Sequence, residues 1–254
     1  SSSGSASTWH PATPPKVADA RDEEFSGADT VGSTWASFTG GTLTPHAIAP
    51  FTSPPAATCY YSWNEAYSGG RPGSFAMQSK NNDVAYGIFK TVTLGATEFI
   101  YTIFSSESSG NQYSAAAQLY LLAPGGEYLA LWWQGANISG AGHFYALSDS
   151  VSNSHEMQGA FREGTGDQAL PGLVCGMGLL KVPAGAGQEN WYWALCNSWG
   201  NWYIYTSSTL RTGVSTLFTR TKVHLLSRNA TAFTTYWPKT TFKCLRFRAD
   251  GSTP

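Results

Sequence analysis

The carboxylates of this chain lack the spacing that glycoside hydrolysis requires. A retaining glycosidase holds two carboxyl groups close together, and on one face of a strand this means a spacing of two or four residues. The sequence contains no E-x-D-x-E or E-x-D-x-x-E pattern. Glu23 and Glu24 are adjacent, so on a strand they would point to opposite faces. Glu127 is followed by a run of uncharged residues and gives no pair.

One irregular stretch, residues 148–168, still contains acids that a fold could bring together. Glu156 and Glu163 lie there and could converge with Asp149 or Asp167. A serine hydrolase is disfavoured because no G-x-S-x-G sequence is present. We therefore expect a protein that is not an enzyme, with a polysaccharide-degrading glycosidase as the less favoured alternative.

The sequence contains no established metal-binding pattern. The histidines occur singly, without the H-x-H or H-E-x-x-H spacing of zinc sites; they are His10, His46, His143, His155 and His224. Residues 81–83 (Asn-Asn-Asp) offer the oxygen ligands that calcium prefers, but the same residue types dominate polar turns. We expect no metal and no cofactor.

The four cysteines are Cys59, Cys175, Cys196 and Cys244. None is part of a C-x-x-C motif, so zinc and thioredoxin-like sites have no support. Four cysteines allow three disulfide pairings, while free cysteines are among the most buried residues. The sequence leaves both interpretations open.

Aromatic residues are the most informative group. They make up 14% of the chain, including ten tryptophans, and carbohydrate sites use flat rings against the C–H faces of sugars. Where two aromatic residues are adjacent on a strand, one ring faces the core and the other faces outward. We expect glycan contacts from Trp63, Tyr67, Trp199 and one ring of the pair Trp132 and Trp133. Burial of all these rings is the alternative, because tryptophan is highly buried on average.

The elements that position these residues are predicted to be short β-strands. Gly and Pro clusters separate runs rich in aromatic and β-branched residues, and no window has a helical period. Two hairpins stand out, at residues 118–133 and 191–205. Further strands are expected at residues 57–63, 74–78, 84–91, 98–104, 143–147, 173–182, 222–227, 232–236 and 241–248. In the last strand, the face that carries Arg246 and Arg248 should be wet.

This pattern predicts an all-β fold, an antiparallel β-sandwich or jelly roll. A chain of 254 residues fits one such domain. We expect residues 1–18 to be an extended Ser/Pro-rich arm or linker and residues 19–254 to be the sandwich domain. Trp9 within the arm is large enough to dock on the domain or on a partner chain.

Charge disfavours two classes of partner. The net charge is −1, 12% of the residues are charged, and no basic run is present. Nucleic-acid binding and a polybasic membrane contact are therefore disfavoured. No stretch approaches the roughly 18 apolar residues of a membrane span, so we expect no membrane insertion.

Residues 19–27 (DARDEEFSG), followed by Trp35, resemble the opening D-D-E-F…W of the concanavalin A-like lectin/glucanase-type domains of bacteriophage virion proteins. Residues 191–208 resemble their aromatic strand, turn and W-x-x-Y-x-S strand, and residues 222–226 and 243–248 resemble their closing strands. The resemblance spans residues 19–250. It implies a concanavalin A-like sandwich in tail fibres, head fibres or capsid decorations, often with glycan contact.

We therefore expect a phage structural protein on the virion surface, whose lectin-like sandwich binds host or environmental glycans. Its partners would be other virion chains, copies of itself included, and a cell-surface glycan. The alternative is a purely architectural capsid or fibre protein without a ligand, in which Trp9 and the arm are buried against a neighbouring chain.

Overall fold

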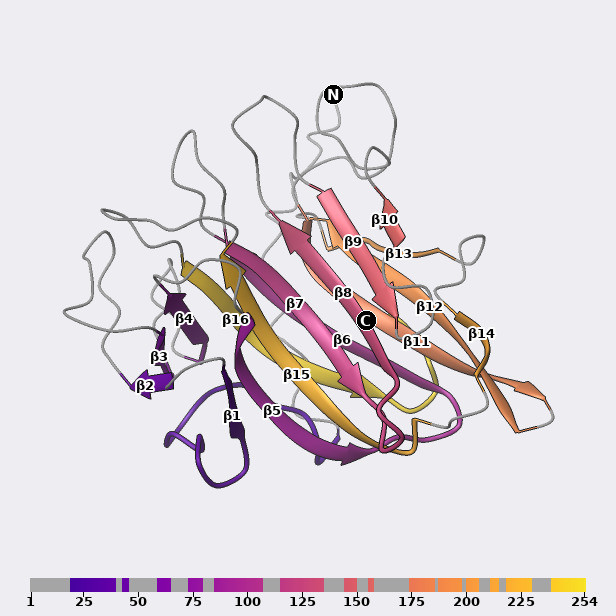
Figure 1. Ribbon diagram of the computed structural model, residues 1–254, viewed down its shortest axis with the longest axis horizontal. Helices are drawn as coiled ribbons and strands as arrows, with labels where there is room; N and C mark the ends of the chain where they lie inside the picture. The colour runs from indigo at the N-terminus through magenta and orange to yellow at the C-terminus, as the bar shows by residue number, and fades with distance from the viewer. Residues whose placement is uncertain are drawn as a thin grey trace, which may run out of the picture.

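The computed structural model describes residues 19–39, 43–45, 59–64, 73–79, 85–106, 115–134, 144–149, 155–157, 174–185, 187–197, 200–205, 211–214, 218–229 and 239–254. These ranges consist of strands and turns, and they contain no helix that could span a membrane. Two sheets stack face to face (Figure 1). The prediction of an all-β antiparallel sandwich is confirmed.

The first sheet has seven strands, all paired antiparallel, and its strands run side by side across Figure 1. Their order is β1 (Ala36–Thr39), β5 (Ala85–Thr93), β15 (Arg220–Asn229), β7 (Ala115–Leu122), β8 (Tyr128–Gln134), β9 (Phe144–Asp149) and β10 (His155–Met157). Strands far apart in sequence are therefore neighbours, as β5, β15 and β7 are.

The second sheet has nine strands and is antiparallel except where β2 pairs with β3. Its order is β13 (Trp202–Tyr205), β12 (Gln188–Asn197), β11 (Val174–Gly185), β6 (Glu98–Ser106), β16 (Lys239–Arg248), β4 (Phe75–Ser79), β3 (Cys59–Ser62) and β2 (Leu43–Pro45), with β14 (Arg211–Val214) beside β12.

Both predicted hairpins are confirmed. Strands β7 and β8 pair in continuous register around a turn that the Ala123 N–H closes by donating to the carbonyl of Glu127, at 2.8 Å. Within it, Gly126 has a φ of 93°, which favours glycine. Strands β12 and β13 are joined where the Asn197 N–H donates to the Asn201 carbonyl at 3.1 Å. The side chain of Asn197 also accepts from the Asn201 N–H, at 3.0 Å.

The core lies between the two sheets and follows the alternation of side chains along each strand. Trp191 and Trp193 in β12 are fully buried core residues, whereas Tyr192 between them is half-buried on the other face. Leu245 and Phe247 in β16 likewise face the core. The predicted facing of these two strands is confirmed.

The expectation of a wet face on β16 is wrong at Arg246, which is 1% exposed. The segment before β1 supplies two acids to its guanidinium: Asp22 at 3.3 Å, and Glu24. This segment runs beside β16, where Glu23 and Leu245 exchange two backbone hydrogen bonds of 2.9 Å. A buried arginine needs such counter-charges, and here they come from the other end of the chain.

The structure contains some strands that were not predicted, and it leaves some predicted segments undescribed. The short strands β1, β2 and β14 were not expected, and the stretch 148–168 contains the short strand β10. The strand expected at residues 232–236 and the arm at residues 1–18 lie outside the described residues. The domain boundary at residue 18 therefore stays a prediction.

Candidate binding face

The outer face of the seven-stranded sheet carries aromatic side chains in register on three neighbouring strands. His224 in β15 lies opposite Phe89 in β5 on one side and opposite Tyr120 in β7 on the other. Residues opposite one another in a ladder share a face. The residues next to them in sequence, Ile88, Leu225 and Leu119, belong to the hydrophobic core. The three rings therefore point away from the core.

Ring contacts extend this line across five strands. The His224 ring centroid is 4.9 Å from those of Phe89 and Tyr120 and 5.1 Å from that of Phe38 in β1. Tyr120 in turn stacks on Tyr128 in β8 at 5.4 Å. We call Phe38, Phe89, His224, Tyr120 and Tyr128 the aromatic row. Centroid spacings of about 4.5–7 Å are those of favourable aromatic pairs, so the row is a packed surface and not a chance cluster.

His224 is the buried centre of the aromatic row, with 2% of its surface exposed. Burial lowers the pKa of its imidazole from 6.5 to about 4, because removing the ring from water disfavours the charged form. Its Nδ1 atom lies 3.3 Å from the carbonyl oxygen of Tyr120. The ring is therefore neutral at physiological pH and acts as an aromatic packing group.

The other members of the row present accessible ring surface. Phe38 is 37% exposed, while Phe89, Tyr120 and Tyr128 are half-buried. The exposed Lys222 places its ammonium group 5.2 Å from the centre of the Phe89 ring, a favourable cation–π distance. The face thus combines ring surface with phenol hydroxyls and a charged donor.

Trp132, one of the predicted contact residues, lies on the same face. It is opposite Gln118 in β7, which is opposite Leu226 in β15. Leu226 is opposite Gly87, which is opposite Phe38. A second line of outward positions thus runs from Phe38 to Trp132 over four strand spacings, roughly 19 Å. Trp132 is half-buried.

Of the other predicted contact residues, the two that the structure describes, Trp133 and Trp63, do not lie on this face. Trp133 is 6% exposed and belongs to the hydrophobic core, so of the pair 132–133 it is the inward ring. Trp63 is half-buried at the edge of the core, with its ring 5.3 Å from Phe25 and 5.9 Å from Phe75. Tyr67 and Trp199 lie outside the described residues.

The outer face of the nine-stranded sheet carries a smaller aromatic cluster. Phe99 and Tyr101 in β6 stack at 5.3 Å, and Trp202 in β13 meets both edge-on. Phe99 and Tyr101 are buried, and Trp202 is half-buried. This cluster offers less free ring surface than the aromatic row.

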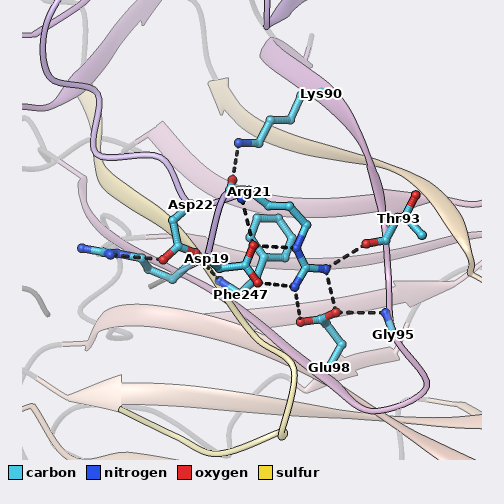
Figure 2. Close-up of polar contacts among 9 residues, drawn as sticks. Asp19, Arg21, Asp22, Lys90, Thr93, Gly95, Glu98 and Phe247 are labelled. Atoms are coloured by element: carbon cyan, nitrogen blue, oxygen red, sulfur yellow. Dashed lines mark hydrogen bonds and ion pairs between the residues drawn. The ribbon is translucent and has the colours of Figure 1, made fainter. Parts of the chain in front are cut away.

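Carboxylates near the first described residues form a structural clasp (Figure 2). The Arg21 guanidinium donates to Asp19 at 2.5 Å and to Glu98 at 2.7 Å. It also donates to the Thr93 carbonyl at 2.8 Å and lies 4.7 Å from the centre of the Phe247 ring. The side-chain hydrogen bond with Arg21 lowers the pKa of Asp19. Both carboxylates are thus held in ion pairs with Arg21, which is a structural role.

A buried ion pair lies beside this group of residues, because Lys181 in β11 is opposite Glu98 in β6. Lys181 is 2.6 Å from Glu189 and donates to the carbonyl of Phe218 at 3.1 Å. Glu189 accepts from the Trp191 indole N–H at 3.2 Å and from the Phe218 N–H at 3.3 Å. A buried ion pair whose remaining hydrogen bonds are satisfied in this way has a structural role.

The structure adds no support for the glycosidase alternative. Glu23 and Glu24 do point to opposite sides, since Glu23 accepts from the Trp35 indole at 3.0 Å while Glu24 pairs with Arg246. Glu163 and Asp167 lie outside the described residues, as do the side chains of Asp149 and Glu156. In the described part of the chain no three His, Cys, Asp or Glu side chains are grouped as a metal site.

The register of the seven-stranded sheet is what sequence reasoning missed. In the sequence, His224 was recognised only as a histidine without a metal-binding neighbour. No sequence pattern indicates that β1, β5, β15, β7 and β8 lie side by side. The available signal was Trp132 beside Trp133, which correctly required one ring to face outward.

No model of a known protein family matches the chain, and no curated protein matches it. Among solved structures, the chain is similar to the Emp47p carbohydrate recognition domain, with a TM-score of 0.46 and 8% identity over 89% of this chain and 92% of that one. It is similar to the CBM2 module of the evolved Dit of Lactobacillus casei BL23 phage J-1, with a TM-score of 0.44 and 11% identity over 89% and 93%. It is also similar to xylan beta-1,4-xylosidase from Bacillus halodurans C-125, with a TM-score of 0.43 and 12% identity over 70% of this chain and 33% of that one. Likeness at this level assigns no function, so the function has to be inferred from the chain's own residues.

Proposed function

We propose that this protein binds glycans on the outer face of its seven-stranded sheet, across the aromatic row and Trp132. The observation that carries the proposal is the set of ring contacts that joins five strands into one surface, with Phe38 37% exposed at one end. Accessible aromatic side chains that are grouped on one face of a sheet are typical of a binding surface.

The chemistry of the face fits a sugar better than a purely apolar ligand. Ring faces pack against the C–H faces of sugars, while polar groups among them orient the hydroxyls. Here the phenols of Tyr120 and Tyr128 and the ammonium of Lys222 lie beside the rings. Because the rings are fixed by one another, little side-chain freedom is lost on binding.

We further propose that the sandwich is displayed on a phage particle and attaches it to host or environmental surfaces. The support is the resemblance of residues 19–27, 191–208, 222–226 and 243–248 to virion domains, together with the low share of charged residues, 12%. In this arrangement residues 1–18 tether the domain, and other virion chains and copies of this chain are its neighbours.

The test is a glycan array of the purified full chain, read for both retention and release of immobilised sugars. Retention without release is expected. Release of sugar fragments would replace the proposal by the glycosidase alternative. No retention by the folded protein would overturn it in favour of the architectural role.

Phe38 and Tyr203 provide a matched pair of variants for this test. They are the exposed large hydrophobic residues of the described chain, at 37% and 36%, and they belong to different sheets. Phe38→Ala should lower retention at least tenfold, and Tyr203→Ala should leave it unchanged. Equal loss in both variants would contradict the assignment to the seven-stranded face. If Phe38→Ala instead weakens self-association, the face is an interface between chains.

A further inference from the structure

A β-bulge places two cysteines of neighbouring strands side by side. Strands β11 and β12 pair antiparallel, but the register shifts between the pairs Val174–Asn197 and Gly176–Cys196. In such a bulge two residues of one strand oppose a single residue of the other. Cys175 is the extra residue, so Cys175 and Gly176 both face Cys196.

The bulge brings the sulfur atoms within reach of each other. The Sγ atoms of Cys175 and Cys196 are 3.9 Å apart, and the Cys175 thiol donates to the Asn197 carbonyl at 3.0 Å. Gly176 makes the approach possible, since a Cβ there would lie 2.9 Å from the Cβ of Cys196 and 3.2 Å from the Trp202 ring. A disulfide needs an Sγ separation of about 2.0 Å, so bond formation requires side-chain rotation that brings the sulfur atoms about 1.9 Å closer.

The two thiols are not equivalent. Cys175 is half-buried, whereas Cys196 is buried. The hydrogen bond between the thiols lowers the pKa of Cys175, with a further contribution from the positive charge of Lys243, while burial opposes both. The same hydrogen bond and burial raise the pKa of Cys196. Because the thiolate is the nucleophile, Cys175 is the residue that reacts first.

We propose that Cys175 and Cys196 are a redox-active pair that closes into an intramolecular disulfide. The oxidant is a low-molecular-mass disulfide, RSSR. The Cys175 thiolate attacks one sulfur of RSSR, which forms the mixed disulfide Cys175–S–S–R and releases RS⁻. Cys196 then loses its proton and attacks Sγ of Cys175, which releases the second RS⁻. Two protein thiols are oxidised, one RSSR is reduced to two RSH, and the two protein protons end on the RSH molecules.

The other cysteines are placed out of reach. Gly176 in β11 is opposite Ile103 in β6, which is opposite Cys244 in β16. Cys244 is therefore two strands from β11 and three strands from β12. These separations are roughly 10 and 14 Å, beyond the limit of about 7 Å for Cα atoms joined by a disulfide. Cys59 belongs to the core on β3, a further two strands beyond β16. Neither Cys59 nor Cys244 can therefore bond to Cys175 or Cys196, and the bond between Cys175 and Cys196 is the one that the strand order allows.

The test starts from the full chain, reduced with dithiothreitol, freed of reductant and then incubated with oxidised glutathione. Thiols are counted in denaturant, and the sites are found by differential alkylation and peptide mass mapping. We expect the count to fall from four to two, with a cross-link that joins the peptides of Cys175 and Cys196. An unchanged count, or a cross-link through Cys59 or Cys244, would overturn the proposal.

Single variants test the order of reaction. Cys196→Ser should accumulate one glutathione adduct, on Cys175, because the second attack is lost. Cys175→Ser should acquire neither adduct nor cross-link, because Cys196 is buried. Cys244→Ala is the matched control and should still form the cross-link. An adduct on Cys196 in Cys175→Ser would refute the assigned roles. The outcome is independent of glycan retention, so the two proposals fail separately.

Discussion

Trp132 and Trp133 are adjacent in β8, yet their rings lie on opposite sides of one sheet: Trp133 belongs to the core and Trp132 to the outer face. We expect Trp133→Ala to lower the free energy of unfolding by about 3–5 kcal/mol, because it leaves a cavity between the sheets. Trp132→Ala should have a smaller effect on stability and should weaken glycan retention at least tenfold. Urea unfolding and array retention measure the two effects. Equal destabilisation by both variants would show that Trp132 is a packing residue.

Arg21 holds together two carboxylates, one of which is wholly buried. Replacing it by methionine leaves Glu98, whose side chain is 0% exposed, as an uncompensated charge. We expect Arg21→Met to cost about 3 kcal/mol in the free energy of unfolding. The double variant Arg21→Met with Glu98→Gln should recover part of the loss, because the charge itself is removed. Urea unfolding of the unchanged protein, the two single variants and the double variant gives the coupling energy between Arg21 and Glu98. Additive effects of the two substitutions would contradict the proposed ion pair.

The lowered pKa of His224 should make the stability of the protein depend on pH. Its pKa is about 4 in the folded protein and about 6.5 in an unfolded chain. Between these values the unfolded state binds a proton that the folded state does not. Stability is therefore complete above pH 6.5 and is lost as the pH falls toward 4, by about 3 kcal/mol.

The matched control for this prediction is His224→Phe, which keeps an aromatic ring at the centre of the row. Unfolding free energies of both proteins are measured from pH 7.5 to pH 4. The difference between them should grow steadily in favour of the variant as the pH falls below 6.5. Parallel curves would mean that the pKa of His224 is the same in the folded and unfolded states, which would contradict the prediction.

Gly87 lies where the backbones of β5 and β15 approach closely. A Cβ on this residue would lie 2.1 Å from the Leu225 carbonyl oxygen, and backbone atoms cannot move aside cheaply. We expect Gly87→Ala to cost about 3 kcal/mol or more. In Gly95→Ala the new Cβ would lie 3.4 Å from the Thr97 carbonyl oxygen, an ordinary contact, so its melting temperature should change little. A similar loss in both variants would contradict the steric explanation.

The sequence predicted the strands that are bounded by clear turns. The hairpins around Gly126 and around Asn197–Asn201 were predicted because alternating apolar residues flank glycine-containing turns. Strands β1, β2 and β14 have three or four residues each, too few for a period of two to be recognised. Their pairing partners, and not their own composition, hold them in the sheets.

The error at Arg246 has the same origin. An arginine that alternates with apolar residues is normally solvent-exposed, and nothing near it in sequence indicates otherwise. Its partner Asp22 is 224 residues away. The candidate face shows this limit too: Trp132 was identified from its neighbour in sequence, whereas Phe89, His224 and Tyr120 meet only through the register of three distant strands.

The clasp at Arg21 also makes this end of the domain a mechanical anchor. The guanidinium bonds the Thr93 carbonyl of β5 in one sheet and Glu98 of β6 in the other, and the Lys90 ammonium donates to the carbonyl of Arg21. Tension on the chain ahead of Asp19 is therefore shared by both layers of the sandwich. It has to break several polar contacts at once instead of unzipping a single strand.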